Sequence, residues 1–229
     1  MTAWVVGQNG TILLTRDGGV TWTPQESHTT ANLYAMAALD KKNAWVIGDT
    51  DGGYAIILRT RNGGRTWVRQ GTQETVKTFG LIDISAADRW TAWAVGADQT
   101  ILRTTDGGNN WVVQMTARPQ MGPHVNGVCA FDGKNAWASV DNDYFYVTTQ
   151  GGDPWITVKT PPDKVTHGYY LISVTGMHMD MIWTVGTAFS WNIPLGNIIF
   201  TSDGGQNWVE QTPPVNTRFR RVSFVGTPK

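Results

Sequence analysis

Residues 92–111 read AWAVGADQTILRTTDGGNNW, and variants of this stretch occur five times in the chain of 229 residues. Its second half is a box, T-x-D-G-G-x-x-W, and the threonine, both glycines and the tryptophan are present in all five copies. The tryptophans that end the boxes follow one another after 45, 44, 44 and 53 residues, at Trp22, Trp67, Trp111, Trp155 and Trp208. A fixed period of about 44 residues is typical of a propeller or a solenoid.

Each unit contains four short segments that favour strands. In the second unit they are LYAMAALD, AWVIGD, AIILRT and TWVRQ, which are rich in β-branched and aromatic residues and are separated by turn residues. We find no helical period of useful length. Four strands per unit match one blade of a propeller, so the sequence predicts an all-β fold.

The two ends of the chain complement each other. The chain begins with TAWVVG, the second strand of a unit, and ends with FRRVSFVGTPK, which resembles a first strand. Their pairing would leave no free sheet edge. We therefore predict a single domain, 1–229, that is a five-bladed β-propeller of four-stranded antiparallel blades, with the ring closed by the C-terminal strand. The blades are expected at 219–229 plus 1–25, 32–70, 79–114, 125–158 and 169–211.

The box is expected to have a structural role. Its Asp can accept backbone N–H groups within its own turn, the Gly-Gly pair supplies positive φ for a hairpin, and the Trp can pack against a neighbouring sheet. Asn62 can replace the Asp as an acceptor, but Gln150 is a poorer substitute and Pro154 follows it, so we expect that hairpin to differ. These acids lie one per blade and do not converge for catalysis or metal binding. The residues assigned to the structural box are Thr15, Asp17, Gly19, Trp22, Thr60, Asn62, Gly64, Trp67, Thr104, Asp106, Gly108, Trp111, Thr148, Gln150, Gly152, Trp155, Thr201, Asp203, Gly205 and Trp208.

The box T-x-D-G-G-x-x-W resembles the Asp-box, or BNR repeat, of sialidases and many other propellers. The longer unit, AWAVGADQTILRTTDGGNNW, is similar to the photosystem II stability and assembly factor propellers, and the resemblance covers essentially the whole chain. It implies a propeller scaffold and an assembly role, whereas the box itself says little about activity. The known assembly factors of that group typically have seven blades, so five units depart from their pattern.

Composition excludes several classes of function. Lys plus Arg and Asp plus Glu both number 18, so no long-range positive field favours nucleic acid. The single cysteine excludes an internal disulfide, a thiolate zinc site and an iron–sulfur cluster. No apolar run approaches the ~18–20 residues that span a bilayer. The start, MTAWVVGQNG, lacks the basic and apolar regions of a signal peptide. We expect neither a cofactor nor a metal, and the compartment stays open.

Groups suited to catalysis are sparse. A sialidase needs an arginine triad from different blades, and a glycosidase needs two carboxylates across a cleft. The three glutamates, Glu26, Glu74 and Glu210, fall in connecting loops. Asp83, within LIDIS, could face the axial channel, but the sequence indicates no second carboxylate to pair with it. We therefore predict that the protein is not an enzyme, and a glycosidase is the least favoured alternative.

Departures from the repeat are the best candidates for binding. The loop 187–197, TAFSWNIPLGN, lengthens the last interval and carries Phe189 and Trp191, which the repeat does not require. An aromatic loop on a rigid scaffold suits recognition, although it could instead fold over a blade. Trp90 also lies outside the repeated tryptophans and is expected to pack on its own blade. The candidate ligand-binding residues are Phe189, Trp191, Asp83, Arg218 and Arg220, and Arg221 adds to the local positive charge.

The favoured hypothesis is a non-catalytic propeller that binds another macromolecule through a loop face, as an assembly or interaction module. One alternative is a glycan-binding lectin that uses loop aromatics. Another is a structural or receptor-binding component of a larger particle, such as a phage appendage. We expect a protein partner or else a glycan, and no nucleic acid.

Overall fold

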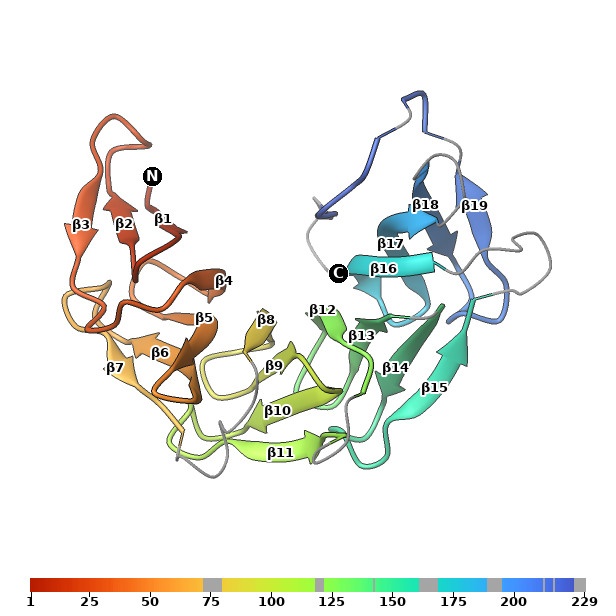
Figure 1. Ribbon diagram of the computed structural model, residues 1–229, viewed down its shortest axis with the longest axis horizontal. Helices are drawn as coiled ribbons and strands as arrows, with labels where there is room; N and C mark the ends of the chain where they lie inside the picture. Colours follow the sequence, from red (N-terminus) through yellow and green to blue (C-terminus); the bar gives the residue numbers. More distant parts are fainter. Residues whose placement is uncertain are drawn as a thin grey trace. The chain divides into compact units, whose positions relative to one another are not determined.

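In a computed structural model of the protein (Figure 1), every regular element among the described residues is a β-strand. The described residues are 1–71, 80–117, 122–141, 143–160, 169–188, 195–211, 213–215 and 217–224. Among them, no helix is long and apolar enough to cross a membrane. The chain divides into two compact units, Met1–Gly122 and Pro123–Lys229.

The first unit contains three antiparallel sheets, in which strands that follow one another in the chain lie side by side. The first sheet has three strands: β1 (Ala3–Val6), β2 (Ile12–Thr15) and β3 (Thr23–Gln25). The second sheet consists of β4 (Leu33–Ala38), β5 (Ala44–Asp51), β6 (Tyr54–Thr60) and β7 (Val68–Arg69). The third sheet consists of β8 (Leu81–Ala86), β9 (Ala92–Gly96), β10 (Thr100–Thr104) and β11 (Val112–Met115).

The second unit contains two sheets of four strands with the same order. The fourth sheet consists of β12 (Val125–Ala130), β13 (Ala136–Val140), β14 (Tyr144–Thr148) and β15 (Ile156–Lys159). The fifth consists of β16 (Tyr169–His178), β17 (Met181–Ala188), β18 (Leu195–Thr201) and β19 (Val209–Gln211). Within each unit, the first strands of neighbouring four-stranded sheets pack together, β4 on β8 and β12 on β16, as in a propeller.

The predicted fold class is confirmed, because five antiparallel sheets follow the five sequence units and four of them have four strands. The first sheet has three strands among the described residues. Its expected fourth strand is the C-terminal segment, of which residues 217–224 belong to no strand and 225–229 lie outside the described residues. Closure of the ring by this segment and the single domain stay predictions.

Three tryptophans of the AW segments, Trp45, Trp93 and Trp137, lie at the centre of the second, third and fourth sheets. Trp45 and Trp93 are 0 % exposed, and each lies opposite an arginine on the next strand. The guanidinium carbon of Arg59 lies 3.2 Å from the ring centroid of Trp45, and that of Arg103 lies 5.2 Å from Trp93. Burial lowers the pKa of Arg59 to about 10. Cation–π contacts of a buried tryptophan, with the buried Arg59 or the partly buried Arg103, therefore add to the pairing of the second and third strands in these sheets.

Candidate functional site

The boxes form hairpins with one shared geometry. In all five, the threonine hydroxyl accepts a hydrogen bond from the N–H of the second glycine, at 2.7–2.9 Å. Both glycines of every box have positive φ, a conformation that residues with a Cβ rarely adopt. Sequence reasoning missed the role of the threonine, although its presence in all five boxes was the signal.

The Asp of the box accepts further hydrogen bonds within the same hairpin. Asp106 accepts the N–H of Asn110 at 2.9 Å and the hydroxyl of Thr104 at 2.9 Å. These bonds, led by the one from the Asn110 backbone, hold the pKa of Asp106 below its usual value. In the fourth box, Pro154 has no N–H at the corresponding position. An acid is therefore not needed there, which accounts for Gln150.

We predict that Asp106→Ala lowers the free energy of unfolding by about 1–2 kcal/mol, because a charge-assisted bond to a backbone N–H is lost. Asp106→Asn should retain most of the stability, since Asn62 accepts the N–H of Thr66 in the second box at 3.1 Å. The pKa of Asp106 is lowered on folding, so its contribution is present at neutral pH and disappears as the pH falls below the ordinary value of 3.8. Urea titrations of the three proteins at several pH values measure this, and equal losses in both variants would contradict it.

The predicted ligand-binding residues are divided between the two units and the residues outside the described ranges. Phe189 and Trp191 lie outside the described residues. Asp83 is in β8 of the first unit, opposite Val95, and is 8 % exposed. Arg218 and Arg220 are exposed and belong to no strand of the second unit. Within the described ranges, no group of three or more His, Cys, Asp or Glu residues could hold a metal ion.

A site that sequence reasoning missed lies in the first unit. A pocket of about 460 Å³ is lined by Asn62 and by five cationic residues, which we call the basic cluster: Arg16, Lys41, Lys42, Arg61 and Arg65. All five are exposed. None of them forms an ion pair with an acidic residue in the described part of the chain. The protein has no net charge, yet this surface is locally positive.

Two arginines of the basic cluster are fixed by the repeat itself. Nη2 of Arg16 donates to the carbonyl oxygen of Gly63 at 3.0 Å, and Nη2 of Arg61 donates to that of Gly107 at 2.9 Å. Each arginine follows the threonine of its own box and reaches the first glycine of the next box. A guanidinium group has five N–H donors, so each arginine is held in place with donors left for a ligand.

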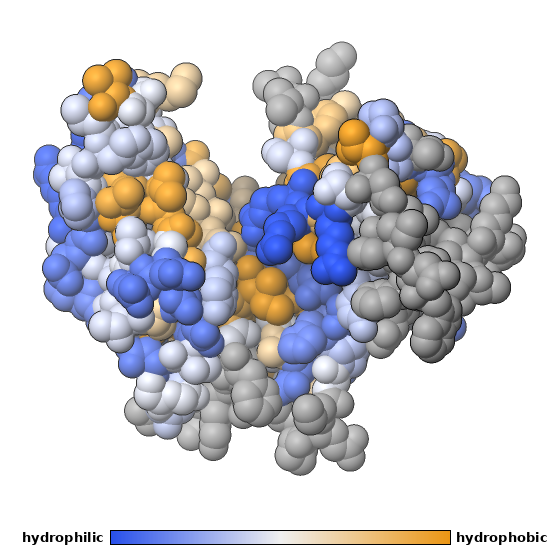
Figure 2. All heavy atoms as spheres, turned by 45° about the horizontal axis from the view of Figure 1, so that its top comes forward, coloured by the Kyte–Doolittle hydropathy of each residue, from blue (hydrophilic) through white to orange (hydrophobic). Residues whose placement is uncertain are grey.

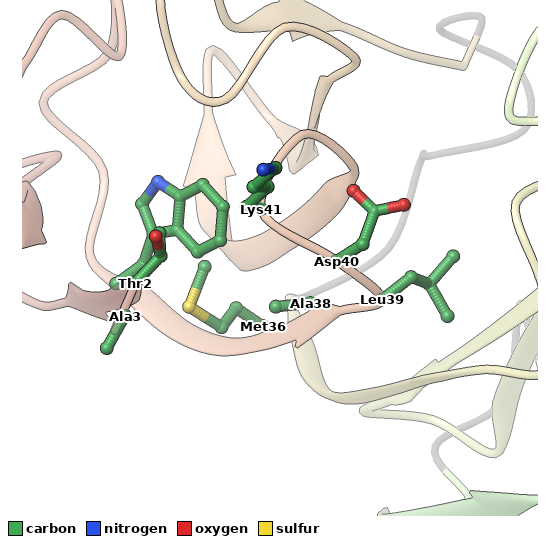
Figure 3. A pocket seen from close by; sticks show the side chains of 8 residues that line it. Thr2, Ala3, Met36, Ala38, Leu39, Asp40 and Lys41 are labelled. Atoms are coloured by element: carbon green, nitrogen blue, oxygen red, sulfur yellow. The ribbon is translucent and has the colours of Figure 1, made fainter. Parts of the chain in front are cut away.

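A second pocket, of about 620 Å³, adjoins the basic cluster, because Lys41 lines both. It lies between β1 and β4, and Figure 3 shows Met36, Leu39, Asp40 and Lys41 around it. Trp4 contributes its indole, whose Nε1 donates to Gln25 at 3.0 Å. Elsewhere, the view in Figure 2 shows apolar residues in several separate patches and not as one continuous surface.

Comparison with known proteins identifies the family of this chain. The model of the family described as photosynthesis system II assembly factor YCF48 matches residues 1–77 and 70–211. A solved structure described as YCF48 bound to D1 peptide is 18 % identical, with a TM-score of 0.56, and the match covers 97 % of this chain and 83 % of that one. YCF48 from Cyanidioschyzon merolae is also 18 % identical, with a TM-score of 0.59 and coverages of 95 % and 82 %.

More distant enzymes share the fold. A GH74 enzyme from Niastella koreensis is 12 % identical, with a TM-score of 0.58, and the match covers 91 % of this chain and 43 % of that one. No curated protein sequence matches significantly. The family model covers most of the chain and agrees with the resemblance seen in its repeats. The chain therefore belongs to the family of the photosynthesis system II assembly factor YCF48.

Proposed function

We propose that this protein is a non-catalytic propeller that binds an acidic segment of another protein through the basic cluster. One observation carries the proposal: five exposed cations surround a single pocket, and none has an ion-pair partner among the described acidic residues. The family supports a protein partner, since one member has been solved with a bound D1 peptide.

The geometry of the arginines suits a carboxylate ligand. Arg16 and Arg61 are already held by the carbonyl oxygens of Gly63 and Gly107, so little side-chain freedom is lost when a ligand binds. A planar guanidinium pairs with a carboxylate through two parallel N–H bonds, which gives direction as well as attraction. Asp or Glu side chains of an extended segment would also relieve the repulsion among the five cations.

The geometry gives less support to catalysis. The box carboxylates of Asp17, Asp106 and Asp203 are engaged in their own hairpins, where they accept bonds from the following turn. The GH74 enzymes share only the fold at this level of identity. The lectin alternative depends on Phe189 and Trp191, which lie outside the described residues, so no structural observation favours it.

The test is a binding titration with a fluorescein-labelled oligoglutamate peptide, compared with an oligoglutamine peptide of the same length. The double variant Lys42→Glu/Arg65→Glu should bind oligoglutamate at least about tenfold more weakly, because opposite charges are replaced by like charges. Lys159→Glu, at an exposed lysine of β15 outside the basic cluster, is the matched control and should bind as the unmodified protein does.

Salt should weaken the interaction of the unmodified protein, since the cations of the basic cluster are exposed to solvent. Equal binding of oligoglutamate and oligoglutamine would refute the proposal. So would an equal loss in the double variant and in Lys159→Glu. A titration with a D1 peptide then tests whether this chain shares the ligand of its relative.

A further inference from the structure

Two hydrogen bonds that recur in the repeat hold the backbone of Trp90. In three sheets, an Asp in the turn before the AW strand accepts the N–H of the second residue after it, at 2.6 Å in each case. The carbonyl oxygen of that second residue accepts the N–H of the first box glycine, at 2.8–3.0 Å. The residues held in this way are Lys42, Trp90 and Lys134. A tryptophan therefore stands in the third sheet where the second and fourth sheets have lysine.

The indole of Trp90 is mostly left to solvent. The sequence led us to expect it to pack on its own blade, but the residue is 54 % exposed. Its backbone is fixed by Asp88 and Gly107, and a tryptophan side chain has two rotatable angles. An exposed, rigidly attached aromatic ring loses little conformational entropy when it is covered by a partner.

Trp90 also lies beside one end of the basic cluster. A Cβ placed on Gly107 would be 3.5 Å from Cε3 of Trp90 and 3.0 Å from Nη2 of Arg61. The indole and the guanidinium group thus border the same point. The carbonyl of Gly107 holds the guanidinium group of Arg61, and the N–H of Gly107 holds the backbone of Trp90, so both residues are attached at this point without a ligand.

We infer that Trp90 is an apolar anchor at the Arg61 end of the basic cluster, and that the partner is an acidic segment carrying an apolar or aromatic side chain next to its acidic residues. This inference rests on the proposed function and adds the chemistry of the ligand. Trp and Arg are the residues that dominate binding energy at protein interfaces. A side chain that covers the indole also excludes water from the neighbouring ion pair and so strengthens it.

Cations with an aromatic side chain are also used to bind single-stranded nucleic acid, in which successive bases stack on several rings. Here the net charge is zero, so no long-range positive field attracts a phosphate backbone. This observation favours an acidic protein segment. A nucleic-acid ligand is therefore included as an outcome of the test.

The experiment uses two fluorescein-labelled oligoglutamate peptides that differ only in a central residue, Phe or Ala. The unmodified protein should bind the Phe peptide about threefold to tenfold more tightly, the range expected for one aromatic pair. Trp90→Ala should remove this preference, so that the two peptides bind this variant with equal affinity. Trp90→Lys should remove it as well, in a residue type that the fold accepts at Lys42 and Lys134.

Tyr34→Ala is the matched control, because Tyr34 is an aromatic residue of β4 that is 50 % exposed and outside the basic cluster. It should retain the preference for the Phe peptide. If the preference survives in Trp90→Ala, the anchor is refuted while the proposed function stands. If neither peptide binds the unmodified protein, both are refuted. If the unmodified protein binds an oligothymidine more tightly than either peptide, and Trp90→Ala loses this binding, the partner is a nucleic acid and not a protein.

Discussion

Replacing Trp93 by alanine is expected to lower the free energy of unfolding by about 3–5 kcal/mol, the range for a buried tryptophan. Trp93 is 0 % exposed and lies in β9, with strands on both sides of it. Its removal leaves a cavity and also takes the aromatic partner from Arg103, whose pKa is already lowered by burial. Both consequences destabilise the same sheet, so the loss should be near the upper end of the range.

Trp22→Ala is the matched control for this substitution. Trp22 ends the first box and is 40 % exposed, whereas its counterparts Trp67 and Trp111 are 4 % and 2 % exposed. Its loss should cost less than about 2 kcal/mol, since less apolar surface returns to water. Urea unfolding followed by far-ultraviolet circular dichroism gives both values. Equal losses at Trp93 and Trp22 would contradict the central role of the AW segments.

The strands and the core could be predicted because the repeat marks them locally. A Gly-Gly pair with positive φ ends each box hairpin, and this backbone conformation depends on the residues of the hairpin itself. Trp45, Trp93 and Trp137 recur at one place in the unit and are buried, whereas Trp4 and Trp183 at the same place are partly buried. These features can be predicted without knowing which distant segments contact one another.

The basic cluster could not be predicted in this way, because its cations come from three separate segments. Arg16 belongs to the first box, Lys41 and Lys42 to a turn, and Arg61 and Arg65 to the second box. They meet because Arg16 reaches across to the carbonyl of Gly63 in the neighbouring sheet. The zero net charge of the chain gave no indication of this local excess, and the exposure of Trp90 likewise depends on which side of a turn faces solvent.

Gly96→Ala is expected to lower the free energy of unfolding by about 1–3 kcal/mol, as overpacking does. Gly96 ends β9, and a Cβ there would collide with the carbonyl oxygen of Gly80 and come within 2.9 Å of Cα of Leu81. The register shift between Leu81 and Asp83 lies in the strand opposite. The same carbonyl accepts the N–H of Ala97 at 3.2 Å, so the strand can yield only by losing a hydrogen bond.

Gly7 holds the corresponding position in the first sheet. A comparison of Gly7→Ala with Gly96→Ala therefore tests the predicted C-terminal strand. Its Cβ would meet nothing closer than Cβ of Thr11, at 4.0 Å, because that sheet has no first strand among the described residues. The sequence predicts that residues 219–229 supply this strand. Gly7→Ala should then cost about as much as Gly96→Ala in the full chain, but little in a chain that lacks 219–229. If Gly7→Ala is harmless in both chains, the C-terminal segment does not complete the first sheet, because a strand opposite Gly7 would leave no room for the added methyl group.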